Sequence, residues 1–141
     1  MKNLFTNVIN VHAEAATLQA MLADPTKMLK WIPEIETVTE DQGRFQIIRQ
    51  TEALNQSEMI TVTQTEHQIV YHSTEGRLAY DLTFKLTPAD DQTILTETLA
   101  VPEKAETHLP LKLLAPIAKH AFYENLTNLA LLAERWAYQG N

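Results

Sequence analysis

The clearest pattern in the chain is a strict alternation of apolar and polar residues over positions 78–87. Period-two alternation is typical of an antiparallel strand with one face buried and the other in water. Looser patterns of the same kind predict six further strands. These cover residues 4–12, 35–39, 44–51, 59–65, 69–74 and 93–101. Short polar turns separate the strands after residue 35, so the pattern predicts a series of hairpins.

Two short segments after the first strand have helical rather than strand periodicity. Residues 15–22 are alanine-rich, and their apolar positions recur at helical spacing. Pro25 ends this helix, because the residue before a proline is pushed out of the helical region. We expect Thr26 to cap a second short helix over 27–30.

A long helix is predicted over residues 111–138, with one broad apolar stripe centred on Phe122. Pro116 lies inside it, so we expect either a kink or a start near Ala115. Leu113, Ile117 and Leu131 fall on or near the outer face of this helix. They are expected to be exposed, to pack on a partner subunit, or to pack under the linker over 102–110, which leaves both a monomer and a homodimer open.

Composition narrows the class of protein. With 141 residues and 45% hydrophobic residues, the chain is expected to form one domain over 1–141. A net charge of −7 argues against nucleic-acid binding, and the absence of cysteine excludes disulfides and thiolate catalysis. No apolar run is long enough to span a membrane and no signal peptide is evident, so a cytoplasmic location is expected.

Catalytic and cofactor motifs are missing. The three glycines are far apart, which excludes a glycine-rich phosphate loop, and the two serines lie in no nucleophile elbow. The five histidines show no spacing typical of metal ligands. We therefore expect no metal and no cofactor.

The predicted order is strand, two short helices, six strands and a long helix, which is an α+β fold. A strongly twisted antiparallel sheet of seven strands curls, and the long helix can pack in its concave face. This order, the segments Ala23-Asp24-Pro25 and Trp31-Ile32-Pro33, and the amphipathic last helix resemble the helix-grip fold of the START and birch-pollen-allergen superfamily. That superfamily is also called SRPBCC or polyketide cyclase/dehydrase-like. The resemblance implies an internal cavity between sheet and helix that accepts a hydrophobic small molecule.

Three polar residues share a strand face with the predicted core. If Leu86 pairs near Leu95, Glu97 faces Phe84 between apolar neighbours, where a carboxylate is costly unless it is paired or protonated. Arg49 and Tyr80 belong to the same inner face. One interpretation makes Glu97, Arg49 and Tyr80 the polar contacts of a ligand. The simpler one, which we favour, lets Glu97 and Arg49 face solvent, because a small boundary error inverts a strand.

The leading functional hypothesis is binding or transport of a hydrophobic small molecule or lipid under the last helix. Its candidate ligand-binding residues are Phe45, Ile47, Arg49, Tyr80, Leu82, Phe84, Glu97, Leu99, Leu114, Ala118, Phe122 and Leu126. The first alternative is an enzyme of the cyclase or dehydratase kind, for which Glu97 and Tyr80 are the only proton-transfer pair we nominate. The second alternative is a protein-interaction module.

Overall fold

The computed structural model describes residues 1–50, 54–103 and 109–139, with an antiparallel sheet of seven strands and three helical segments. The strands are β1 (Lys2–Val11), β2 (Ile35–Asp41), β3 (Arg44–Arg49), β4 (Ser57–Thr65), β5 (Gln68–Thr74), β6 (Tyr80–Ala89) and β7 (Gln92–Val101). The helices are α1 (Ala15–Leu22), the 3₁₀ helix η1 (Pro25–Lys30) and α2 (Leu111–Gln139). The predicted α+β helix-grip architecture is confirmed.

The sheet order is β1-β7-β6-β5-β4-β3-β2. Only β1 leaves the hairpin sequence, because α1 and η1 carry the chain from one edge of the sheet to the other. In the β6–β7 hairpin Phe84 pairs with Glu97 and Leu86 pairs with Leu95. The register predicted from the sequence is confirmed, and it places Glu97 on the buried face.

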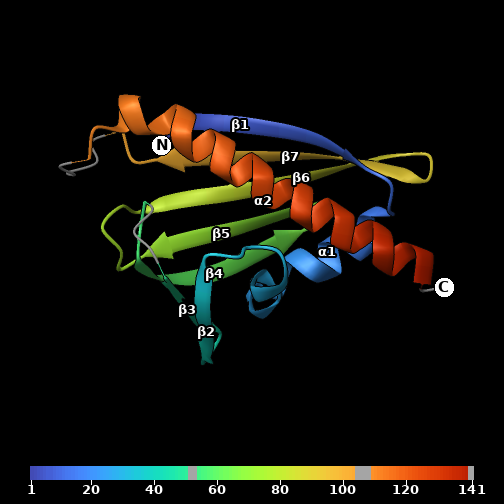
Figure 1. Cartoon of the computed structure of the whole chain (residues 1–141), viewed down its shortest axis with the longest axis horizontal. Coiled ribbons are helices and arrows are strands. Elements are labelled where there is room, and N and C mark those ends of the chain that lie inside the picture. The colour runs from blue at the N-terminus through green and yellow to red at the C-terminus, as the bar shows by residue number, and fades with distance from the viewer. Residues whose placement is uncertain (51–53, 104–108, 140–141) are drawn as a thin grey trace.

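Helix α2 lies diagonally across the sheet (Figure 1), in contact with β1 along its course and with α1 toward its end. Its two halves are buried to different degrees. Leu126, Leu129, Ala130 and Ala133 in the second half are buried. In the first half, the apolar residues that pack against the core are only partly buried; they are Leu111, Leu114, Ala118 and Phe122. The second half therefore anchors α2 to the rest of the fold.

Several predicted boundaries are wrong by a few residues. Helix α2 begins at Leu111 with Pro116 inside it, so the alternative start near Ala115 is wrong. The cap of η1 is Asp24, which accepts from the Thr26 backbone N–H, rather than Thr26 itself. Strand β4 begins at Ser57, two residues earlier than predicted. Thr51, the expected end of the third strand, lies outside the described residues.

The turn after β5 contains Glu75 and Gly76. Glu75 takes the left-handed conformation, with φ 61°, and Gly76 does not. Gly76 is needed for space, because a Cβ there would lie 2.6 Å from Cγ of Asn55. No helix in the described ranges is both long and apolar enough to cross a membrane.

Replacing Leu129 tests how firmly α2 is anchored. Leu129→Ala removes a fully buried side chain, and we expect it to lower the free energy of unfolding by about 2–5 kcal/mol. Leu113→Ala is the matched control, because Leu113 is 73% exposed and its loss should cost less than about 0.5 kcal/mol. Urea unfolding followed by circular dichroism measures both. Equal effects of the two substitutions would contradict the anchoring role.

Candidate functional site

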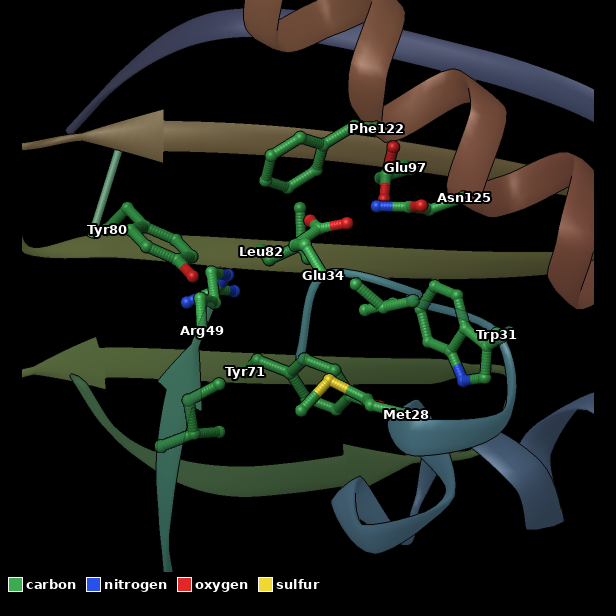
Figure 2. A pocket seen from close by; sticks show the side chains of 12 residues that line it. Met28, Trp31, Glu34, Arg49, Tyr71, Tyr80, Leu82, Glu97, Phe122 and Asn125 are labelled. Atoms are coloured by element: carbon green, nitrogen blue, oxygen red, sulfur yellow. The ribbon is translucent and has the colours of Figure 1, made fainter. Parts of the chain in front are cut away.

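A partly enclosed pocket lies between the inner face of the sheet, η1 and α2 (Figure 2). Its apolar wall is formed by Met28, Trp31, Ile32, Ile60, Tyr71, Leu82 and Phe122. Its polar lining consists of Glu34, Arg49, Tyr80, Glu97 and Asn125. The cavity volume is about 20 Å³, which is room for about one water molecule. The hollow implied by the resemblance is present but small.

Glu34 and Asn125 mark where this pocket reaches the surface. Both residues also line an open groove on the outside of α2. The groove continues over Pro33 and along α2 past His120 and Glu124. We therefore take the gap between the segment after η1 and the middle of α2 as the mouth of the pocket.

A buried ion pair closes one end of the pocket. Nη1 of Arg49 on β3 lies 2.5 Å from Oε1 of Glu58 on β4, and both side chains are almost fully buried. Nη1 also donates to the backbone carbonyl of Asn55 at 3.2 Å. An isolated charge at this depth is very costly, so each partner is tolerated only because the other is present.

Glu58 also accepts hydrogen bonds from three neutral side chains. The donors and their distances are Asn55 at 3.0 Å, Ser73 at 2.5 Å and Tyr80 at 2.9 Å. Burial by itself raises the pKa of Glu58, but Arg49 and these hydrogen bonds outweigh it and hold that pKa below its usual value. Glu58 is therefore ionised, and the pair with Arg49 has no net charge.

Glu97 lies at the other end of the pocket in a different environment. It is 1% exposed, and its hydrogen-bond donor among the described residues is Nδ2 of Asn7 on β1, at 3.2 Å. Burial raises the pKa of Glu97 to about 8, although Asn7 and Lys119 act in the opposite direction. At neutral pH most molecules therefore carry Glu97 as an uncharged acid, which can both donate and accept a hydrogen bond.

Five of the twelve predicted ligand-binding residues line the pocket: Arg49, Tyr80, Leu82, Glu97 and Phe122. The favoured solvent-facing interpretation of Arg49 and Glu97 is wrong, since they are 8% and 1% exposed. Four others are buried core residues outside the lining, namely Ile47, Phe84, Leu99 and Leu126. Phe45, Leu114 and Ala118 are partly buried against the core. The nominated pair is not joined, because Tyr80 donates to Glu58 and not to Glu97.

Sequence reasoning missed the polar residues Glu34, Glu58 and Asn125. Glu58 shares a face with Ile60, but the predicted strand began one residue after it. Asn125 lies about 60° from Phe122 on a helical wheel, so a polar residue inside the apolar stripe was a usable signal. Glu34 precedes β2, in a connection without periodicity, and no pattern marks it.

Other candidates from the sequence lie elsewhere. Leu113, Ile117 and Leu131 are exposed, as predicted for the outer face of α2. Trp31 is buried, whereas Trp136 is partly exposed beneath the ammonium groups of Lys27 and Lys30. Within the described part of the chain, no three His, Asp or Glu side chains are grouped to hold a metal ion.

The chain matches one known protein family over most of its length. Residues 4–134 match the family model described as polyketide cyclase / dehydrase and lipid transport. The chain belongs to this family. No curated protein is similar enough to count as a relative.

Solved structures share the fold of the family at low sequence identity. A START superfamily protein from Mycobacterium smegmatis is 22% identical, with a TM-score of 0.67 over 97% of this chain and 98% of that one. The Zhui aromatase/cyclase from Streptomyces sp. R1128 is 17% identical, with a TM-score of 0.68 over 94% and 93%. A conserved protein from Geobacillus kaustophilus is 15% identical, with a TM-score of 0.71 over 93% and 95%.

The buried ion pair of this family member can be tested against an exposed one. Glu58→Gln leaves the Arg49 charge buried without a counter-charge, and we expect a loss of about 3–5 kcal/mol in the free energy of unfolding. Glu75→Gln removes the partner of Arg44 at the surface and should cost at most about 1 kcal/mol. Chemical denaturation at pH 7 compares the two. A Glu58→Gln protein as stable as Glu75→Gln would refute the assignment.

Glu97 should make stability depend on pH. Its folded pKa of about 8 lies above the ordinary value of 4.5, so the folded state binds the proton more tightly than the unfolded state. This contribution is complete below pH 4.5 and is lost as the pH rises toward 8. The side chain of the Glu97→Gln variant cannot ionise. The variant and the native protein should therefore have similar free energies of unfolding near pH 4.5. Near pH 8 the variant should be more stable than the native protein by several kcal/mol, at ~1.4 kcal/mol per pKa unit. Denaturation curves measured in steps of pH check this, and a constant difference would contradict it.

Proposed function

We propose that this protein binds a small, mostly apolar molecule in the pocket between the sheet and α2. The observation that carries the proposal is the mixed lining of that pocket. An apolar wall meets a few convergent polar groups, which is the usual composition of a small-molecule site. The family description, which includes lipid transport, agrees with this proposal.

The small volume means that binding requires the pocket to open. A volume of about 20 Å³ holds about one water, so an organic ligand has to displace protein atoms. The first half of α2 is the part that can yield at low cost, because its apolar residues are only partly buried. Phe122 is the pocket residue on this half, and its ring packs edge-on against Phe5 with centroids 5.2 Å apart. A shift of Phe122 toward solvent enlarges the cavity without disturbing the anchored second half.

Binding is tested with the uncharged fluorophore N-phenyl-1-naphthylamine, whose emission rises in an apolar site. We expect saturable binding, which Leu82→Trp should weaken at least about tenfold because the indole fills the pocket. Phe122→Ala should strengthen binding, since it enlarges the cavity. Leu113→Trp adds an indole at the exposed face of α2 and is the control. Circular dichroism verifies that each variant folds. No saturable binding, or equal binding by all variants, would refute the proposal.

A catalytic role in the same pocket is the second candidate, and the state of Glu97 favours it. A buried carboxyl with a pKa of about 8 is protonated at neutral pH and is suited to act as a general acid. Tyr80 does not supply the second group, because burial and Glu58 raise its pKa and its hydroxyl donates to Glu58. Glu97→Gln separates the two functions: an enzyme loses turnover, whereas a carrier keeps its affinity for the fluorophore.

A further inference from the structure

The charges around the pocket do not balance. Arg49 is its only basic lining residue among those described, and Glu58 neutralises it directly behind the pocket wall. Glu34 is the acidic lining residue besides Glu97. No side chain in the described ranges forms an ion pair or hydrogen bond with it, although it attracts Arg49 from beyond ion-pair distance. Lys119 acts on Glu97 from beyond Asn7 and is exposed to solvent, so its charge is screened. The pocket as a whole is therefore acidic.

Three side chains that can accept a hydrogen bond lie between the middle of the pocket and its Glu97 end. Figure 2 shows Glu97 and Asn125 close together on the side of the pocket away from Arg49 and Tyr80, with Glu34 between the two groups. Each of these side chains has an oxygen that can accept a hydrogen bond. The apolar wall of Trp31, Leu82 and Phe122 surrounds them. This part of the pocket therefore offers up to three acceptors, one of them on an acidic side chain without a direct ion-pair partner among the described residues.

We propose that the ligand of this pocket is an apolar primary amine, bound as its ammonium ion with Glu34 as counter-charge. The inference rests on the function proposed above. An ammonium group has three N–H donors, which match the acceptors of Glu34, Glu97 and Asn125. A carboxylate or phosphate brings a second negative charge into a poorly hydrated site where Arg49 is already paired. The mouth adds to this selection, because Glu34 lies at the entrance.

Charge-assisted hydrogen bonds explain why the amine is preferred over a neutral analogue. A hydrogen bond between ionised partners is roughly twice as strong as a neutral one, and low hydration strengthens it further. An alcohol of the same shape fills the same apolar space and donates a single hydrogen bond. The two ligands therefore share the apolar contribution and differ in their interaction with Glu34.

The test compares three ligands that share one ring and differ in one group: benzylamine, benzyl alcohol and benzoate. Calorimetric titration at pH 7 should show the amine binding about tenfold tighter than the alcohol, and benzoate at least about tenfold weaker than the alcohol. Amine binding favours the ionised form of Glu97 and should release protons. Titration in two buffers with different ionisation enthalpies measures that release. The alcohol should release none.

Variants at the mouth identify the counter-charge. Glu34→Gln should reduce amine affinity about tenfold and leave alcohol affinity within about twofold, because only the ionic interaction is lost. Glu124→Gln removes a carboxylate from the outer groove, where it pairs with His120 at 2.7 Å, and is the matched control with no expected effect. Asn125→Asp adds a carboxylate to the lining and should tighten amine binding further.

The outcomes distinguish this inference from the function on which it rests. If the fluorophore and benzyl alcohol bind but benzylamine binds no more tightly, the amine assignment is overturned and the binding function stands. Equal amine affinity in Glu34→Gln and in the native protein overturns it as well. If neither the fluorophore nor any member of the series binds, the proposed function itself fails.

Discussion

The buried ion pair between Arg49 and Glu58 determines the charge of the pocket and links the strands that form one end of it. Buried charges are tolerated only when each is paired and hydrogen-bonded. Glu58 meets this condition, because besides Arg49 it accepts hydrogen bonds from Asn55, Ser73 and Tyr80. The pair therefore joins neighbouring strands β3 and β4, with hydrogen bonds from β5 and β6. It also removes the only described cation of the pocket lining from contact with a ligand's charge. The acidity of the remaining lining follows from this arrangement.

The two halves of α2 have different roles: the second half stabilises the fold, and the first half covers the pocket. Leu126, Leu129 and Ala133 are fully buried and hold the helix in place, while the half that bears Phe122 covers the pocket with partly buried side chains. Packing in an anchored region resists change, because filled interiors have few voids. A partly exposed side chain loses less packing energy when it is displaced than a fully buried one does. This member of the polyketide cyclase / dehydrase and lipid transport family thus has a small pocket, and the part of α2 that covers it is only partly buried.

Different parts of the site were visible in the sequence to different degrees. Strict alternation in β6 placed Tyr80 and Leu82 inside, and the hairpin length set Glu97 opposite Phe84. That register made a buried Glu97 one of two interpretations, but the one favoured from the sequence placed Glu97 in solvent, and the structure corrected it. Glu58 was missed because the predicted strand began at the apolar Met59. Backbone pairing with β3 extends β4 two residues further, to Ser57. Glu34 had no signal at all, since its position depends on how η1 packs against β2.

By itself the sequence determined the order of elements, the inner face of the strands, the amphipathic last helix and the family. These are local properties: periodicity, turn residues and composition act over a few neighbours along the chain. The tertiary structure alone decided the size of the pocket, its mouth and its charge. Those depend on distances between residues from η1, β3, β4, β7 and α2, which are far apart in the chain. Whether Arg49 is free or neutralised is decided by Glu58 on the adjacent strand, and no pattern along a single element records it.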